Sequence, residues 1–449
     1  MNVRDAAADL RSTLASLDAG ALGTEMRAAV RELYPICRSI TGEGLRSSLR
    51  MLQQIAPIEL HEVATGTQVF DWVVPREWTF RSARLIAPDG RVVLDAARCN
   101  LHLLNYSVPF RGKLRLEELQ KHLHSLPDKP ALVPYRTSYY QDSWGFCLSD
   151  EQRRSLQPGE YTVEIDTTLA PGSLTYGEAV IRGAREEEVL ISTHCCHPSL
   201  ANDNCAGMVL SATLARMLGR LRPRYTYRFL FVPGTIGAIT WLAVNEERAL
   251  RIRHGLVAAC VADAGRLTYK RSRRGDAEID RVVAHVLAHS GQPHEIRAFT
   301  PYGYDERQYC SPGFDLAVGS LTRTPHGEYP EYHTSGDDLD FIQPDKMVDT
   351  LRRYLEVFAV LEGNRVWVNL SPKCEPQLGK RGLYGAVGGQ SHTAATQMAM
   401  LWVLNLGDGK HTLLDVADRA RLPFADVRQA AEALAGAGLL RAADGEARG

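Results

Sequence analysis

The sequence lacks the long apolar run that a membrane-spanning helix needs, and it has no excess of charge of either sign. Nowhere does it contain an uninterrupted apolar stretch of about 18 residues. Lysine and arginine number 52 against 53 aspartates and glutamates, a net charge of −1, so no overall field draws the chain to nucleic acid or anionic membrane. The opening M-N-V-R-D-A-A-A-D-L carries charges where a secretory signal needs an apolar core. We therefore expect a soluble, cytoplasmic protein with no membrane partner.

The sequence also lacks the even set of cysteines that is typical of a disulfide-stabilised protein. Its nine cysteines are odd in number and scattered along the chain, which is typical of reduced thiols. No internal repeat stands out. At 449 residues the chain is long enough for two or three domains, because domains commonly span about 100 to 200 residues.

Changes in hydrophobic pattern divide the chain into three parts. Helical periodicity near the N-terminus gives way at residue 58 to short β-like runs separated by proline and glycine, and these runs end near residue 164. We predict a catalytic domain made of residues 1–57 and 165–372, with residues 58–164 as an inserted, mostly-β lobe. Helical patterns within residues 384–449 end in G-L-L-R and predict a winged-helix-like C-terminal domain.

Apolar strands alternate with amphipathic helices in the predicted catalytic domain. The runs V-L-I-S-T (189–193) and Y-R-F-L-F-V-P (227–233) are each followed by a helical pattern. This order is typical of an α/β fold in which a mixed or parallel sheet has helices on both faces. In such folds ligands bind at the carboxyl ends of the strands. Polar residues that follow these strands are therefore candidates for a functional site.

Four potential metal ligands follow predicted strands or stand in the loops beside them. They are His194, Asp203, Asp263 and His333. Metal ligands must offer free lone pairs, and two imidazoles with two carboxylates suit zinc, with manganese or cobalt as alternatives. Each residue alone also has an ordinary structural interpretation: a histidine at a strand end often forms only a hydrogen bond, and Asp203 could cap a helix. The prediction of a metal site depends on the four together.

The segment that carries His194 and Asp203 is T-H-C-C-H-P-S-L-A-N-D-N-C-A-G. His197 could replace His194 as a ligand, but the proline that follows it favours a structural role in a turn. Cys195 or Cys196 could act as a nucleophile activated by a histidine. Adjacent residues of an extended segment point to opposite sides, so we favour buried or supporting roles for both thiols.

The same segment resembles the first metal-binding segment of the zinc aminopeptidases of the bacterial leucyl aminopeptidase and glutamate carboxypeptidase group. Asp263 and the later segment Y-H-T-S-G-D-D strengthen the resemblance. More closely, the chain is similar to a bacterial family of aminopeptidase-like proteins. This similarity spans nearly the whole chain and is carried by D-W-V-V-P-R-E-W, P-Y-R-T-S-Y-Y, W-G-F-C-L, Y-K-R-S-R-R-G, D-E-R-Q-Y-C-S-P-G-F and E-Y-P-E-Y-H-T-S.

The resemblance implies that His194 and Asp263 bind one metal, that Asp203 bridges two metals and that His333 binds the second. It also exposes a departure. The zinc aminopeptidases carry two adjacent glutamates, a general base and a metal ligand, after the strand that corresponds to Y-R-F-L-F-V-P. This chain has P-G-T at that point, with Gly234 in place of the base. We therefore expect one tight zinc site and a second site, at His333, that is weak or empty.

The missing base has no evident replacement in the sequence. A positioned general acid or base contributes about 10²- to 10⁴-fold to catalysis, and glycine cannot transfer a proton. Acidic residues near His333 and in the segment Y-D-E-R-Q are the candidates, and they are Glu328, Glu331, Asp305 and Glu306. A solvated loop charge is the ordinary interpretation of each of them.

These features predict a metallohydrolase that cleaves an amide or peptide bond of a small molecule or short peptide through metal-bound water. One alternative is a protein that binds zinc or a ligand but has lost catalysis with the glutamate pair. Another is a regulator that responds to a small molecule through its C-terminal domain. From residue 408 onward, six lysines and arginines accompany seven acidic residues. We therefore expect this domain to pack on its own chain or on a second copy in a homo-oligomer, with no nucleic acid as partner.

Overall fold

The computed structural model describes residues 6–383 and 393–443. The chain forms two compact units. One unit, Leu17–Asp280 with Pro293–Arg352, contains the central sheet, the inserted lobe and every predicted site residue. The other contains the N-terminal helix, Arg281–Gln292 and the chain from Arg353 onward. Among the described helices, none is both long enough and apolar enough to cross a membrane.

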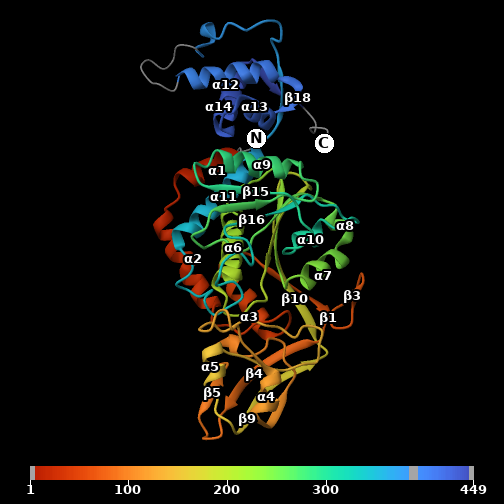
Figure 1. The fold of residues 1–449 in the computed structure, drawn as a ribbon. Helices are drawn as coiled ribbons and strands as arrows, with labels where there is room; N and C mark the ends of the chain where they lie inside the picture. The colour runs from red at the N-terminus through yellow and green to blue at the C-terminus, as the bar shows by residue number, and fades with distance from the viewer. Residues whose placement is uncertain (1–5, 384–392, 444–449) are drawn as a thin grey trace. The chain divides into compact units, whose positions relative to one another are not determined.

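An eight-stranded mixed sheet forms the centre of the first unit (Figure 1). Its strands, in spatial order, are β1 (Glu59–Ala64), β10 (Ser173–Ile181), β12 (Thr226–Val232), β11 (Glu188–His194), β13 (Ile252–Val257), β16 (Val318–Thr322), β14 (Leu267–Lys270) and β15 (His294–Arg297). The four central strands, β12, β11, β13 and β16, are parallel to one another. Their carboxyl ends therefore meet at one edge of the sheet, where a ligand is expected.

Helices cover both faces of this sheet (Figure 1). Helices α2 (Ala19–Leu33) and α6 (Ala206–Leu218) pack together on one side, and α7 (Ile236–Val244) with α10 (Glu306–Tyr309) lies on the other. Because both faces are covered, every residue of β11 and β12 is buried. The predicted α/β architecture with a mixed sheet is confirmed. Outside the inserted lobe, the other α-helices described before residue 364 are α1 (Ala6–Ala15), α3 (Glu43–Leu52), α8 (Glu246–Ala249), α9 (Glu278–Ala288) and α11 (Pro344–Gly363).

The inserted lobe is built on a four-stranded antiparallel sheet. Its strands, in spatial order, are β5 (Val92–Asp95), β4 (Glu77–Ile86), β9 (Glu160–Ala170) and β6 (Phe110–Arg115). Beside it lie the pair β7 (Leu123–His124) with β8 (Phe146–Cys147) and the short helices α4 (Leu116–Leu119) and α5 (Asp150–Arg154). The pair β2 (Gln68–Val69) with β3 (Trp72–Val73), also within residues 58–164, packs instead against α7. Strand β1, which the boundary at residue 58 assigns to the lobe, pairs instead with β10 of the central sheet.

The second unit contains a small sheet and three helices from the C-terminal part of the chain. The sheet has the order β18 (Asp408–Thr412), β17 (Val366–Asn369) and β19 (Leu440–Ala442), and the helices are α12 (Thr393–Leu406), α13 (Leu413–Ala420) and α14 (Phe424–Gly436). Because β17 is the middle strand, this fold begins before the predicted boundary at residue 384. Residues 384–392 and 444–449 of the predicted domain lie outside the described residues.

Candidate functional site: a histidine and aspartate cluster

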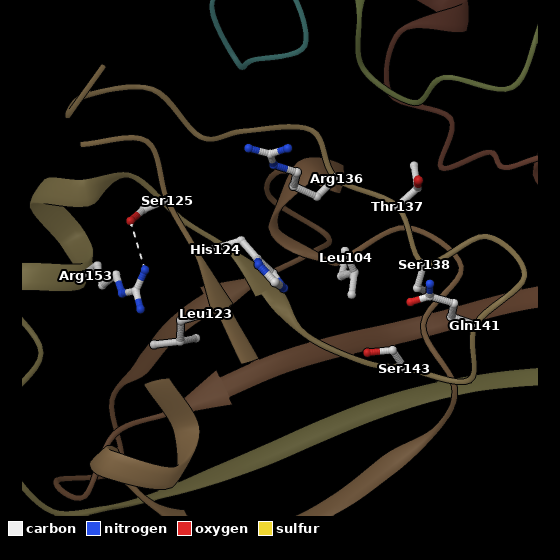
Figure 2. A pocket seen from close by; sticks show the side chains of 10 residues that line it. All are labelled: Leu104, Leu123, His124, Ser125, Arg136, Thr137, Ser138, Gln141, Ser143 and Arg153. Carbon is white, nitrogen blue, oxygen red and sulfur yellow. Dashed lines mark hydrogen bonds between the residues drawn. The ribbon is translucent and has the colours of Figure 1, made fainter. Parts of the chain in front are cut away.

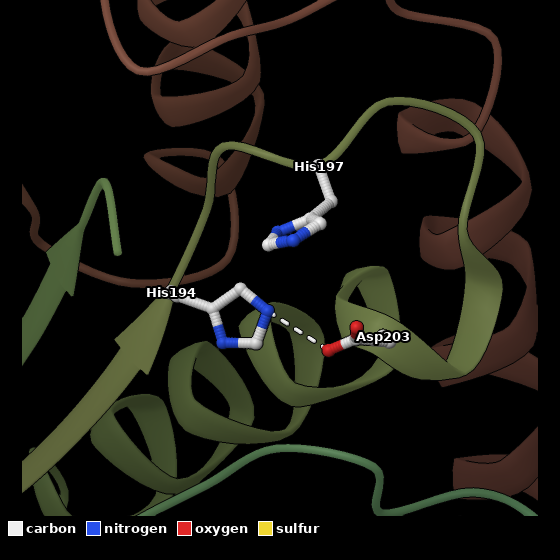
Figure 3. Close-up of side chains that lie close together, drawn as sticks. All are labelled: His194, His197 and Asp203. Carbon is white, nitrogen blue, oxygen red and sulfur yellow. Dashed lines mark ion pairs between the residues drawn. The ribbon is translucent and has the colours of Figure 1, made fainter. Parts of the chain in front are cut away.

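His194 and Asp203 meet at the carboxyl edge of the central sheet. His194 is the last residue of β11, and Asp203 lies in a single irregular turn, Ala201–Cys205, directly before α6. Both side chains are buried, and His194 Nε2 lies 2.9 Å from Asp203 Oδ1 (Figure 3). The sequence therefore placed these two residues correctly at a strand end and a helix start, and the structure brings them together.

Two further histidines surround Asp203. His333 Nε2 lies 3.0 Å from Asp203 Oδ2, so the two carboxylate oxygens face two different imidazoles. His197 also belongs to this cluster: its ligand atom and those of His194 and Asp203 all lie within 4.8 Å of one another (Figure 3). The sequence favours a structural role for His197 over its alternative role as a ligand. The spacing H-x-x-H in the segment was the signal that it shares the site.

The cluster has the properties of a metal site. His194 Nε2, His333 Nε2 and Asp203 Oδ2 are buried, yet no hydrogen bond of acceptable geometry satisfies them among the described residues. Burial alone would raise the pKa of Asp203, but the neighbouring imidazoles, His194 first, outweigh it and hold that pKa well below its usual value. A carboxylate and imidazoles with unsatisfied lone pairs are the ligands that zinc prefers. The residues present therefore fit zinc.

Hydrogen bonds hold the Asp203 turn in place. Asp337 accepts hydrogen bonds from the backbone N–H groups of Asn202 (2.6 Å) and Asp203 (2.9 Å). Asn204 donates from Nδ2 to Thr193 Oγ1 at 2.8 Å and to the carbonyl oxygen of His194 at 3.1 Å. Residues on both sides of Asp203 are thus fixed, one of them to β11 itself. Such support orients a metal ligand before the metal arrives.

Asp263 does not join this cluster. Strand β13 ends at Val257, six positions before Asp263, and the carboxylate turns toward other partners. It accepts hydrogen bonds from Thr324 Oγ1 (2.5 Å), the Gly265 N–H (2.8 Å) and Asn202 Nδ2 (3.0 Å). These contacts occupy its lone pairs. In the structure Asp263 therefore positions the residue before Asp203, and the tight site expected to include Asp263 is instead grouped around His194, His197, Asp203 and His333.

Cys260 and Tyr304 adjoin the cluster, and the sequence did not single them out for this site. Tyr304 donates from its hydroxyl to Asp203 Oδ1 at 3.3 Å, and its ring stacks on His194 with 5.0 Å between centroids. Cys260 Sγ lies 2.9 Å from the Tyr304 hydroxyl oxygen. Cys260 is three residues past the end of β13, so Cys260, and not Asp263, is the residue after this strand that contacts Tyr304 beside the cluster. No feature of the sequence distinguishes Tyr304 from the other tyrosines.

Gly234 lies beside His194 and Asp305. Strands β11 and β12 are parallel neighbours with His194 opposite Val232, so Gly234 follows its strand at the same edge of the sheet. A methyl group built on Gly234 would lie 3.1 Å from His194 Cβ and 3.7 Å from Asp305 Oδ1. The carboxylate of Asp305 therefore reaches the space into which a longer side chain at position 234 would extend.

Asp305 differs from the other three candidates for the missing base. It is 1% exposed, neither of its oxygens has a hydrogen-bond partner among the described residues, and burial raises its pKa to about 7. Glu306 forms an ion pair with Lys270 (2.5 Å), and exposed Glu328 pairs with Arg297. The partly buried Glu331 has no described contact with the histidines. Among the four, only Asp305 combines burial, absence of a partner and a place beside His194.

The two thiols of the segment are poorly suited to act as nucleophiles. Burial raises the pKa of Cys196 to about 12 and that of Cys195 well above its usual value. The thiolate is the reactive form, so neither cysteine carries a useful population of it near pH 7. This agrees with the buried role that we favoured for both.

Comparison with known proteins identifies relatives over nearly the whole chain. Residues 27–364 match the family described as "Domain of unknown function (DUF4910)", and residues 365–442 match a winged helix-turn-helix family. A Clostridium acetobutylicum protein is 48% identical over 412 residues, which is 92% of this chain and 95% of that protein. Its name is "Putative polysaccharide biosynthesis protein with aminopeptidase-like domain".

Solved structures agree with this fold. A "putative peptidase" from Clostridium acetobutylicum superposes with a TM-score of 0.93 at 44% identity, covering 97% of this chain and 100% of that chain. A zinc aminopeptidase from Bacillus subtilis superposes with a TM-score of 0.55 at 13% identity, covering 75% of this chain and 93% of that chain. The second likeness is one of fold alone. The predicted aminopeptidase-like fold and the predicted winged-helix-like domain are both confirmed, and the chain belongs to the DUF4910 family, followed by a C-terminal winged helix-turn-helix domain.

Proposed function

We propose that this protein is a zinc-dependent hydrolase that cleaves an amide or peptide bond of a small substrate. One observation carries the proposal: three unsatisfied ligand atoms, on His194, Asp203 and His333, converge at the carboxyl edge of the sheet. An unpartnered carboxylate, that of Asp305, lies next to His194. The aminopeptidase-like fold agrees with a hydrolase.

The residues that would hold zinc are His194, His197 and Asp203, whose ligand atoms all lie within 4.8 Å of one another, and His333 faces the other carboxylate oxygen of Asp203. Enclosure lowers the pKa of His197 well below its usual value, so its imidazole is neutral at pH 7 and has a lone pair to offer. Bound zinc supplies Lewis acidity, which polarises an amide carbonyl and lowers the pKa of water. We propose one zinc ion per chain.

Asp305 is the proposed proton carrier. Hydrolysis of an amide requires a proton to leave the attacking water and a proton to reach the departing nitrogen. A carboxylate oxygen of Asp305 accepts the first proton, and the same group then donates to the amine. A pKa of about 7 suits both steps, because the group is readily protonated and deprotonated near neutral pH. Gly234 leaves the space that this carboxylate requires.

The inserted lobe restricts what reaches the cluster. Tyr135, a lobe residue, lies against His197 and His333, with ring centroids 4.9 and 5.1 Å apart. Its backbone N–H donates to the carbonyl oxygen of His333 at 2.8 Å. A lobe segment is therefore attached directly beside the proposed zinc ligands. We infer that substrates are small molecules or short peptides, because an extended protein chain would meet this segment.

The second candidate function is zinc or ligand binding without catalysis. Gly234 favours it, because no glutamate stands at that position. The two candidates differ in what they predict for Asp305. A binding protein has no need of a proton carrier, whereas a hydrolase loses its activity when that carboxylate is removed.

A substrate panel tests the proposal. Purified protein loaded with zinc would be incubated with aminoacyl amides, dipeptides and N-acetylated amino sugars, the last included because of the name of the Clostridium relative. We expect hydrolysis of at least one class, and we expect Asp203→Ala to abolish it. The matched control is Asp166→Ala, which removes an exposed lobe carboxylate paired with Arg81. Zinc-loaded protein that cleaves no member of the panel would favour the binding function.

A further inference from the structure

The inserted lobe contains a pocket that shares no residue with the histidine cluster. Its volume is about 420 Å³, which is within the range of pockets that hold small ligands. In Figure 2, Arg153 and Ser125 line one side, and Thr137, Ser138 and Gln141 line the other. The complete lining consists of Leu104, Leu123, His124, Ser125, Arg136, Thr137, Ser138, Gln141, Ser143 and Arg153.

The lining carries positive charge and no acidic residue. Two guanidinium groups, those of Arg136 and Arg153, face the pocket (Figure 2). Two acidic residues stand nearby. Asp142 pairs with Arg76. Asp150 Oδ2 lies 2.5 Å from Arg154, and Asp150 Oδ1 accepts a hydrogen bond from Ser125 Oγ, the atom to which Arg153 donates. The charge of Arg136 has no described carboxylate partner, and it favours an anionic ligand.

The two arginines differ in a way that suits recognition. Arg153 is held in place, with Nε donating to Gln120 Oε1 at 2.7 Å and a terminal nitrogen donating to Ser125 Oγ at 3.3 Å. Arg136 is exposed, and its side chain has no described hydrogen bond or ion pair. One guanidinium is thus preorganised, and the other has all its donors available. Guanidinium donors match the oxygens of phosphate and carboxylate groups.

Neutral polar groups complete the lining. The side chains of Thr137, Gln141 and Ser143 have no described hydrogen-bond partner, and neither ring nitrogen of His124 has one. Burial lowers the pKa of His124, and the charges of the two arginines lower it further, so its imidazole is neutral and can both donate and accept. These groups offer donors and acceptors in several directions, as the hydroxyl groups of a ligand require.

We propose that this pocket binds a small molecule in which a phosphate or carboxylate group is attached to a hydroxyl-rich body, such as a sugar phosphate or a sugar acid. The oxyanion contacts Arg136 and Arg153, and the hydroxyl groups contact Thr137, Gln141 and Ser143. Phosphate and carboxylate share the chemistry that the two guanidinium groups recognise, and the experiment below distinguishes them.

Two consecutive residues connect the pocket with the histidine cluster: Arg136 lines the pocket, and Tyr135 packs on the cluster. Arg136 follows Tyr135, whose ring packs on His197 and His333. The carbonyl oxygen of Arg136 accepts a hydrogen bond from the Asn105 N–H at 2.9 Å, which ties this segment into the lobe. A ligand held by Arg136 therefore lies next in the chain to the residue that packs on the cluster. The binding site itself does not depend on any activity at the cluster.

Titration calorimetry at low ionic strength tests the proposal with three probes: glucose 6-phosphate, glucuronate and glucose. We expect at least one of the two anions to bind, and neutral glucose to bind more weakly or not at all. Arg136→Ala should weaken the binding of that anion about 10-fold or more, because it removes hydrogen bonds to a charged group. Because the side chain of Arg136 has no described partner, its loss should leave the fold intact. Arg115→Ala, which removes another exposed lobe arginine, is the matched control and should not change the affinity.

The calorimetry distinguishes a phosphate ligand from a carboxylate ligand. Binding of glucose 6-phosphate that needs Arg136 supports a phosphate ligand, and binding of glucuronate that needs Arg136 supports a carboxylate. Absence of anion binding by the folded wild type, or an affinity that Arg136→Ala leaves unchanged, overturns the proposal. Glucose that binds as tightly as its phosphate overturns it as well, because the guanidinium groups would then contribute nothing.

Discussion

Asp305→Asn is expected to lower kcat by about 10²- to 10⁴-fold, the usual contribution of a positioned general acid or base, while zinc content stays unchanged. Asparagine has nearly the same shape as aspartate but cannot accept and return a proton. The carboxylate it replaces is buried, unpartnered and close to both His194 and Gly234. The measurement is kcat on the best substrate of the panel, with zinc determined in the same sample.

The control for Asp305→Asn is Glu328→Gln, which removes an exposed carboxylate paired with Arg297. This variant should keep full activity. A rate for Asp305→Asn within about threefold of wild type would remove Asp305 from the mechanism, since a general base contributes far more than that.

The pH dependence follows from the same carboxyl group. Burial raises the pKa of Asp305 to about 7, so the group is protonated at lower pH and cannot accept a proton. Activity should therefore fall as the pH drops through about 7. Ionisation of Asp305 has the opposite effect on stability: it favours activity but lowers the free energy of unfolding. The ionised carboxylate is unfavourable in the folded state, so above pH 7 metal-free Asp305→Asn should unfold at a higher temperature than wild type.

Arg228→Met is expected to cost about 3–5 kcal/mol of unfolding free energy, the usual effect of removing one partner from a buried ion pair. Arg228 lies in the middle of the central sheet and is 4% exposed. Its guanidinium group lies 2.6 Å from Glu188 on β11 and 2.7 Å from Glu178 on β10. Without Arg228, the buried carboxylate of Glu188 would lose its ion-pair partner, and that of Glu178 would keep only the hydrogen bond from Trp241 Nε1 (2.9 Å) and the contact with His61 (3.7 Å). Urea unfolding, followed by far-UV circular dichroism, measures the loss.

Two further variants separate charge from packing at Arg228. Arg81→Ala breaks an exposed ion pair with Asp166 and should change stability by less than about 1 kcal/mol. Arg228→Met combined with Glu178→Gln and Glu188→Gln removes every charge of the network, and it should recover much of the loss. If this triple variant is as unstable as Arg228→Met alone, the cost comes from packing and the ion-pair explanation is incorrect.

The sequence predicted the parts of the site that depend on local pattern. His194 was placed by the end of an apolar strand, and Asp203 by the start of the next helix, and both are where the pattern put them. A strand-helix boundary is visible in sequence because hydrophobic periodicity changes there. The fold class followed from the same alternation of strands and helices.

The residues that the sequence misplaced depend on exact strand ends and on contacts between distant segments. The apolar run from His254 continues past the last paired residue of β13, so it gave no sign that Val257, rather than Asp263, ends the strand. Asp305 reaches its place through tertiary packing: Tyr309 of α10 hydrogen-bonds to Ser192 of β11 at 2.9 Å and fixes the short helix that follows Asp305. Nothing in the local sequence encodes that contact, so Asp305 was one of four equal candidates.

Zinc content tests the central claim most directly. Wild type, Asp203→Ala and the exposed control Asp166→Ala would be loaded with zinc, freed of excess metal on a desalting column and analysed by mass spectrometry for metal per chain. Asp203 contacts both His194 and His333, so the account predicts about one zinc per chain in wild type and control, and almost none in Asp203→Ala. Equal zinc in wild type and Asp203→Ala, or a wild type that retains none after loading, would contradict it.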